Sequence, residues 1–358
     1  MSFVAAVLIF GIIIMIHEFG HFLFAKLNGI GVIEFSLGMG PRLYSFEKGG
    51  TRYSVKILPF GGSCMMLGED EENSDQSAFN NKSVWARISV VAAGPIFNFL
   101  LAFLLSMVIV GLTGYQPATV MEVMDGYPAK EAGLLPGDMI TEINGRNIHS
   151  KDDITLYIQT HAGKTMKVEY KRADGNGGVE RRSAVIVPQY SEEDGGYLMG
   201  VRFDGVAKPV NGIGQLLVHS AYEVKYWIQY VFDAFYMMFH GEVSLNDLSG
   251  PVGIVTTIDD TVDQVIPYGR TVVILTLINF CILLSANLGV MNLLPIPALD
   301  GGRLVFLFIE AVRGKPIIEA VRGKPIDKEK EGMVHMAGMM LLMALMVLVL
   351  FNDVRKLF

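Results

Sequence analysis

Three residues near the N-terminus have the types and spacing of a metal-dependent hydrolase. His17 and His21 stand four positions apart, and Glu18 follows the first histidine directly. On an α-helix this spacing places both imidazoles on one face, where they can share a metal ion, with a carboxylate beside them for proton transfer. The His-Glu-x-x-His pattern is typical of zinc-dependent peptide hydrolysis. The spacing therefore predicts a zinc site on a helix.

The surroundings of this motif are as apolar as lipid. A hydrophobic stretch runs from Phe3 to Ala25, and the segment from Ser2 to Ile16 has no charged residue. A helix on the surface of a soluble enzyme would be amphipathic instead. Ionisable groups inside a membrane-spanning helix are costly and usually have a function. We therefore expect the metal to lie within a membrane.

Two histidines do not complete a catalytic zinc site, which usually has three protein ligands. Asp300 is the sole carboxylate between Thr271 and Gly302, and it follows a segment with Pro295 and Pro297 that ends an apolar stretch. Irregular backbone persists at membrane depth where protein or a cavity surrounds it. This placement predicts Asp300 as the third ligand, and it leaves Asn292, at the start of the segment, either as a substrate contact or as a cap of the helix end.

Composition points to a multi-span membrane protein. Hydrophobic residues make up 51% of the 358 residues and charged residues 18%, with a mean hydropathy of +0.40. The net charge of -7 comes without a long basic block, which argues against nucleic-acid partners. The two cysteines do not indicate a disulfide framework. The N-terminal segment does not have the pattern of a cleaved signal peptide. Four stretches are long enough to span the bilayer: Phe3 to Ala25, Ile88 to Leu112, Thr271 to about Leu294, and Met333 to Phe351.

The central section contains one recognisable motif. It reads Gly126-Tyr-Pro-Ala-Lys-Glu-Ala-Gly-Leu-Leu-Pro-Gly-Asp138 and continues with Ile143-Asn144-Gly145. These residues resemble the PDZ domain, which implies an α+β domain inserted between the second and third spans. The fold class is thus an α-helical polytopic membrane protein with four transmembrane helices, a membrane-associated β-hairpin and an inserted α+β PDZ domain.

The remaining segments are organised around these spans. Alternation on both sides of Gly49-Gly50, over Arg42 to Phe46 and Thr51 to Leu58, predicts a hairpin, which could be a small element without a role in chemistry or an edge that pairs with an extended substrate. Charges between Ile213 and His240 favour an amphipathic juxtamembrane helix over a fifth span. The predicted divisions are 1–27, the first span; 28–87, the hairpin loop; 88–112, the second span; 113–206, the PDZ domain; 207–268, the juxtamembrane segment; 269–302, the third span and ligand loop; 303–332, a loop with a duplicated nonapeptide at 309–326; and 333–358, the fourth span.

Basic residues near the ends of the spans predict the orientation. Cytoplasmic loops carry an excess of Lys and Arg. The loops between the first two and the last two spans each carry seven, so both should be cytoplasmic: Lys26, Arg42, Lys48, Arg52, Lys56, Lys82 and Arg87, and Arg303, Arg313, Lys315, Arg322, Lys324, Lys328 and Lys330. The active site then lies near the cytoplasmic side, and the PDZ domain and both termini are extracytoplasmic.

Several separated motifs together resemble one family. The chain resembles the site-2 proteases, which are intramembrane zinc metalloproteases, in the combination of His17-Glu18-Phe-Gly-His21, Gly94-Pro-Ile-Phe-Asn98, a PDZ domain, Ser249-Gly-Pro-Val-Gly253 and Asn292 through Leu-Asp300-Gly. It is most similar to their bacterial branch, which implies a location in the bacterial cell membrane. The resemblance implies that His17, His21 and Asp300 bind Zn²⁺ and that Glu18 is the general base and then acid.

The same resemblance implies how substrates would be handled. Asn292 would lie near the substrate backbone, and the strand containing Tyr53, Val55 and Ile57 would pair with the unwound substrate. The PDZ domain would admit single-pass membrane proteins whose outer domain has already been trimmed, such as anti-sigma factors or signal-peptide remnants.

Two other functions have to be weighed against proteolysis. A membrane zinc transporter should carry ionisable groups along several spans, whereas here they gather at one site in the first span and one after the third. A catalytically inactive PDZ scaffold would not need Glu18. For Pro95 and Asn98, a role in helix packing and a role in the site remain open.

Overall fold

A computed structural model describes residues 2–69, 71, 73–174, 177–203, 205–243, 249–313 and 328–356. The chain divides into two compact units. The helical unit comprises Met1–Leu105 and Val243–Phe358, and the inserted unit comprises Ser106–Glu242. Each unit has its own core of buried side chains.

Among the described residues, four helices are long and apolar enough to cross a membrane. They are α1 (Ser2–Leu27), α2 (Val84–Thr113), α7 (Arg270–Leu293) and α10 (Lys328–Lys356). These helices confirm the four apolar stretches predicted from the sequence. Helices satisfy their backbone polar groups internally, which is what a span within lipid requires.

The helical unit is packed around α1. Ile9 and Ile13 of α1 are buried against Cys281 and Leu284 of α7, together with part of α2 and α6 (Pro251–Val265). Helix α1 also approaches α2 closely at Gly20, where a Cβ would lie 2.5 Å from the backbone oxygen of Ala93. Small residues permit such close contact between spans. Close contact between α1 and α2 brings the second span against the histidines.

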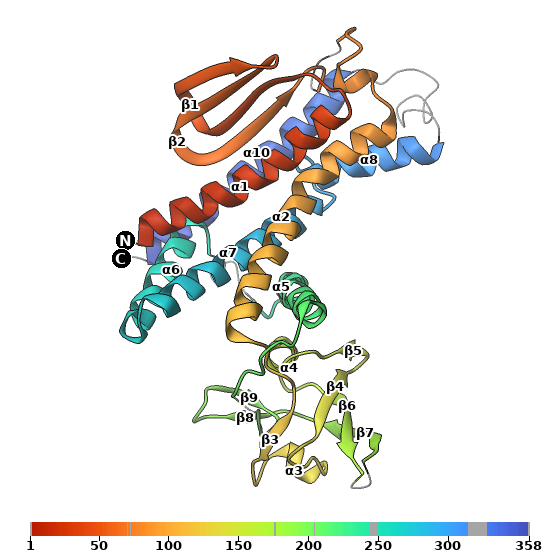
Figure 1. Ribbon diagram of the computed structural model, residues 1–358, viewed down its shortest axis with the longest axis vertical. Coiled ribbons are helices and arrows are strands. Elements are labelled where there is room, and N and C mark those ends of the chain that lie inside the picture. Colours follow the sequence, from red (N-terminus) through yellow and green to blue (C-terminus); the bar gives the residue numbers. More distant parts are fainter. Residues whose placement is uncertain are drawn as a thin grey trace. The chain divides into compact units, whose positions relative to one another are not determined.

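The hairpin is larger than the sequence predicts. Strands β1 (Val32–Lys48) and β2 (Thr51–Met66) are antiparallel and bent, and they lie beside α1 (Figure 1). Residues 34–39 pair with 52–58 on one side, residues 32–37 pair with 62–66 on the other, and 42–48 pair with 51–56. Each long strand therefore contributes two segments to one curled sheet. Gly38 and Gly61 have φ of 86° and 84° at irregular positions of this pairing, so they bend the strands instead of ending them.

A helix replaces the loop expected after the third ligand. Helix α8 (Asp300–Arg313) begins at Asp300 itself. Its residues Leu304 and Leu307 are buried in a cluster with Val90 and Val91 of α2. The spacing of three between these leucines is helical, and it could have indicated this element. Most of the duplicated nonapeptide lies outside the described residues; its first residues belong to α8.

The inserted unit contains both strands and helices. A four-stranded antiparallel sheet has the order β5-β4-β6-β7, and two smaller pairs are β10-β3 and β8-β9. The strands are β3 (Val120–Val123), β4 (Met139–Ile143), β5 (Arg146–Asn147), β6 (Met166–Ala173), β7 (Val179–Ile186), β8 (Gln189–Ser191), β9 (Gly196–Leu198) and β10 (Val201–Phe203). The helices are α3 (Pro128–Glu131), α4 (Lys151–Thr160) and α5 (Ile213–Phe239).

Helix α5 packs on the rest of the inserted unit through polar and aromatic contacts. Arg146 forms an ion pair with Asp233 at 2.6 Å, and the rings of His149 and Tyr222 stack at 3.6 Å. Helix α5 is not among the candidate spans found in the described part of the chain. This agrees with the prediction that the segment from Ile213 to His240 is not a fifth span.

Candidate metal centre

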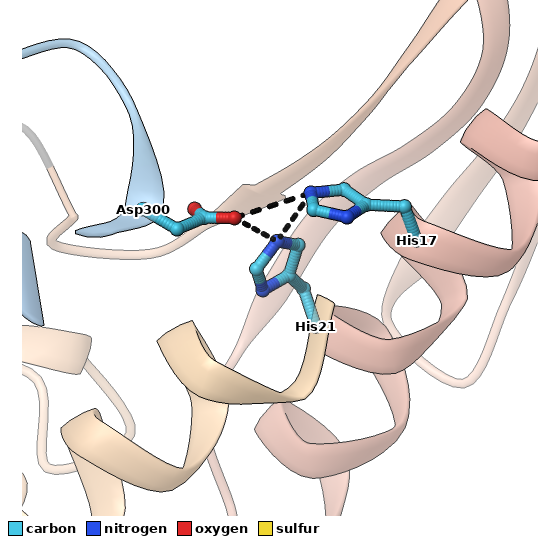
Figure 2. Close-up of side chains that lie close together, drawn as sticks. All are labelled: His17, His21 and Asp300. Atoms are coloured by element: carbon cyan, nitrogen blue, oxygen red, sulfur yellow. Dashed lines mark hydrogen bonds and ion pairs between the residues drawn. The ribbon is translucent and has the colours of Figure 1, made fainter. Parts of the chain in front are cut away.

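The two histidines and the distant aspartate meet at one point. His17 and His21 extend from α1, and Asp300 reaches between them from the first residue of α8 (Figure 2). The two Nε2 atoms are 3.2 Å apart, and the Oδ2 atom of Asp300 lies 3.2 Å from His17 Nε2 and 3.4 Å from His21 Nε2. These are the residues that the sequence predicts as ligands. The fold brings them together across more than 270 positions of the chain.

The size of this triangle fits a zinc ion. Ligand atoms about 2.0–2.1 Å from a tetrahedral zinc are about 3.3 Å from one another. All three edges of the observed triangle are close to that length. Two imidazoles and one carboxylate are also a donor set that catalytic zinc sites use, with a fourth position open. Among the described residues, this is the one group of three or more His, Cys, Asp or Glu side chains close enough to share a metal ion.

The second ring nitrogen of each histidine has a partner on α2. His21 Nδ1 lies 2.9 Å from the backbone oxygen of Val90. His17 Nδ1 lies 3.2 Å from the side-chain amide of Asn98. Partners of this kind orient metal-binding histidines and select their tautomer. Both residues are buried, with exposed fractions of 7% for His17 and 8% for His21.

Gly94 provides the space in which the ligands sit. A Cβ at this position would lie 2.3 Å from His21 Nε2 and 2.8 Å from His17 Cε1. Such distances are far below ordinary van der Waals contact. The glycine of the Gly94-Pro-Ile-Phe-Asn98 motif is therefore required for the imidazoles of His17 and His21 to lie where they do. The sequence contained this signal, but only the packing of α2 on α1 shows its reason.

Glu18 lies at a cavity beside the proposed ligands. The cavity has a volume of about 420 Å³. Its lining includes Asn292 and the following residues: Ile14, His17, Glu18, His21, Gly61, Gly62, Ser63, Cys64, Met66, Glu69, Val91, Leu288, Ala298, Leu299, Asp300 and Arg303. The backbone of Cys64 hydrogen-bonds to the Glu18 carboxylate. A carboxylate next to the ligands and at the wall of a cavity is where a proton-transfer group is needed.

The predicted substrate residues divide into two groups. Asn292 is at the cavity, and its Nδ2 lies 3.4 Å from His17 Nε2. Tyr53, Val55 and Ile57 are absent from the cavity lining. Tyr53 and Val55 each have strand partners on both sides, Phe35 and Phe46 for the first, Leu37 and Tyr44 for the second. The expectation of a free strand edge at these two residues is wrong, because the folded-back β1 covers both sides of this segment.

The strand edge that faces the cavity is a different one. Residues Gly61, Gly62, Ser63 and Cys64 of β2 line the cavity, and the segment 62–66 pairs with β1 on one side. A Cβ at Gly62 would lie 3.0 Å from Glu18 Cγ. The sequence pattern does not indicate this segment, because Pro59, Gly61 and Gly62 are residue types typical of the end of a strand.

Similarity to known proteins agrees with the geometry. The family model of peptidase family M50 matches residues 5–345. A Clostridium acetobutylicum protein whose name contains the words zinc metalloprotease is 39% identical over 354 residues, which cover 99% of this chain and 97% of that protein. The zinc metalloprotease RasP of Bacillus licheniformis is 32% identical, with 99% of both chains covered.

Two further proteins are similar. The regulator of sigma-W protease RasP of Bacillus subtilis is 32% identical over 99% of this chain and 98% of its own length. A solved PDZ domain of Listeria monocytogenes is 31% identical, with a TM-score of 0.22, over 25% of this chain and 88% of that structure. Because the family model covers nearly the whole chain and relatives match it from end to end, this chain belongs to peptidase family M50, the site-2 protease family of zinc metalloproteases.

Proposed function

We propose that this chain hydrolyses peptide bonds within the transmembrane segments of other membrane proteins. The observation that carries the proposal is the triangle of His17, His21 and Asp300 on an apolar helix, with Glu18 at the adjoining cavity. A helix with the length and hydropathy of a membrane span holds two of the three donors. A peptide bond that reaches them has to lie at membrane depth.

The chemistry divides between the ligands and Glu18. His17, His21 and Asp300 would hold zinc, which supplies a Lewis acid that polarises a carbonyl and makes water acidic near neutral pH. Glu18 takes the proton of the attacking water and returns it to the leaving nitrogen.

A transmembrane substrate must be unwound before its carbonyl groups are accessible, because helix hydrogen bonds occupy the backbone. We place the strand that receives it at residues 61–64 of β2 instead of Tyr53, Val55 and Ile57. This segment faces the cavity and Glu18, and strand addition supplies backbone partners to an extended peptide. Asn292, which also lines the cavity, would contact the same peptide.

The substrates we propose are single-span proteins whose outer domain has been trimmed. The Bacillus subtilis relative is named a regulator of sigma-W protease, which favours an anti-sigma factor as one substrate. The inserted unit would act as a PDZ filter outside the membrane. The basic loops would place the metal centre near the cytoplasmic face, with both termini and the inserted unit on the other side.

Substitution of Glu18 tests the mechanism. Purified Glu18→Gln protein should retain one zinc per chain, because no ligand changes, and should lose cleavage of a single-span reporter in detergent. Asp300→Asn should lose both zinc and cleavage. Cleavage by the Glu18→Gln protein would refute the assigned role of Glu18. Full zinc content in the Asp300→Asn protein would remove Asp300 from the ligand set.

A further inference from the structure

Asn98 of α2 is a polar residue that lies fully buried in the helical unit, with 0% exposure. Its side-chain Nδ2 lies 3.2 Å from His17 Nδ1. Its Oδ1 atom has no hydrogen-bond partner among the described residues. Burying one end of an amide without a partner costs about 1–3 kcal/mol. The contact with the imidazole is therefore the feature that accounts for an asparagine here.

The protons of His17 define what this contact must supply. A neutral imidazole has one N–H and one lone pair, on different nitrogens. Nε2 of His17 points toward His21 and Asp300, while Nδ1 faces away from Asp300 (Figure 2). If Nε2 holds a metal ion, the proton must be on Nδ1, and the group opposite must be an acceptor. The side chain of Asn98 stands opposite.

His21 shows the same arrangement with a backbone acceptor. Its Nε2 points to Asp300, and its Nδ1 is 2.9 Å from the oxygen of Val90. A carbonyl oxygen can only accept, so this contact selects the tautomer with a free Nε2 lone pair. Val90 and Asn98 are eight residues apart on α2, two turns of one helix. One span would therefore orient both histidines.

We propose that Asn98 is a positioning residue of the zinc site, whose Oδ1 accepts the Nδ1 proton of His17 and keeps Nε2 available for the metal. The two ends of an amide have nearly the same shape, so either end can occupy the position 3.2 Å from the ring. The structure has Nδ2 in that position and Oδ1 without a partner, but in this orientation the proton of His17 would lie on Nε2 and would block the metal, so we assign the opposite orientation of the amide. The inference rests on the proposed function, because it assigns His17 as a ligand.

Three variants of the full chain separate an acceptor role from a packing role. Asn98→Leu keeps the size and removes the acceptor, whereas Asn98→Asp keeps an acceptor and removes the amide protons. A carboxylate is tolerable at this position because zinc, two neutral imidazoles and Asp300 together carry one positive charge. Ser285→Ala is the packing control, because Ser285 Oγ donates to the backbone oxygen of Asn98 at 2.8 Å and not to its side-chain amide.

The measurements are zinc affinity in detergent, by competition with a chromophoric chelator, and the visible absorption spectrum of the cobalt-substituted protein. Loss of a partner of a metal-binding histidine typically weakens metal affinity by about 10- to 100-fold. We expect that loss, and altered cobalt bands, for Asn98→Leu. Asn98→Asp should remain within about threefold of the unchanged protein by the same reasoning, and Ser285→Ala should match it.

Each result has a defined meaning. Unchanged zinc affinity and cobalt bands in Asn98→Leu would overturn the inference. Equal impairment of Asn98→Leu and Asn98→Asp would also overturn it, because an acceptor would then not suffice. If Asn98→Leu does not fold, Asn98→Ala, which adds no atoms, replaces it in the same comparison. Absence of zinc binding by the unchanged protein would instead refute the proposed function.

Discussion

A single methyl group at position 94 should destroy the metal centre while leaving the fold in place. In Gly94→Ala the new Cβ would lie 2.3 Å from His21 Nε2, 2.6 Å from His21 Cε1 and 2.8 Å from His17 Cε1. Ordinary contact begins at 3.4 Å. The imidazole of His21 would have to retreat by about 1.1 Å, whereas metal–ligand distances tolerate only about 0.2 Å.

The cost to the fold is much smaller than the cost to the site. Overpacking of a core typically costs about 1–3 kcal/mol, which is less than the free energy of unfolding of most domains. We therefore expect a folded Gly94→Ala protein with zinc affinity reduced by at least about 100-fold, the upper range for loss of ligand orientation. Cleavage of the single-span reporter should fall to background. Zinc content is measured by mass spectrometry after dialysis against a weak chelator.

Gly11→Ala is the matched control, because Gly11 is also within a span and a Cβ there meets nothing within 4 Å. Replacing a glycine in a helix by alanine stabilises it by about 0.5–1 kcal/mol. The control should retain zinc and cleavage. If Gly94→Ala also retained both, the close approach of α2 to His17 and His21 would not shape the site, and the reasoning would be refuted.

Three further predictions concern other parts of the chain. Asp353 of α10 accepts hydrogen bonds from the backbone N–H groups of Gly250 and Gly253 at 3.0 and 2.9 Å. Asp353→Ala should therefore lower the free energy of unfolding by about 1–3 kcal/mol, measured as a lower Tm in detergent. Asp353→Asn should have a Tm between those of Asp353→Ala and the unchanged protein, and an unchanged Tm in Asp353→Ala would contradict this reasoning. Arg172 donates two hydrogen bonds of 2.7 Å to the buried carboxylate of Asp138. Arg172→Met should therefore destabilise the inserted unit by about 3–5 kcal/mol and make it sensitive to limited proteolysis, while the zinc content stays constant. Protease resistance equal to that of the unchanged protein would contradict this prediction. Burial lowers the pKa of His149, with smaller contributions from Lys225 and His219 that Asp153 opposes. The stacking of its neutral ring on Tyr222 is therefore fully stabilising above the unfolded pKa of about 6.5, and this stabilisation is lost as the pH falls through the lowered pKa of the folded state. The protection of α5 against hydrogen exchange should then be lower at pH 5.5 than at pH 7.5, values about one unit either side of the pKa of free histidine. His149→Phe should reduce this pH dependence, and equal protection at both pH values would contradict the role of His149.

The sequence alone determined the elements that depend on local pattern. Helical spacing put His17 and His21 on one face with Glu18 beside them, and uninterrupted apolar stretches identified the four spans, because hydropathy and helix geometry are properties of neighbouring residues. The lack of any other carboxylate near the end of the third span was enough to select Asp300.

Only the tertiary structure decided how these elements meet. Whether Asp300 reaches the histidines depends on the packing of α8 and α1, which no local pattern specifies. The hairpin around Gly49-Gly50 was predictable, but the folding back of β1 and β2 was not, because Gly38 and Gly61 are equally compatible with the end of a strand or with a bend. That choice moved the candidate substrate edge from Tyr53 to residues 61–64. The roles of Gly94 and Asn98 likewise follow from contacts between helices, since space and hydrogen-bond partners exist only after α2 has packed against α1.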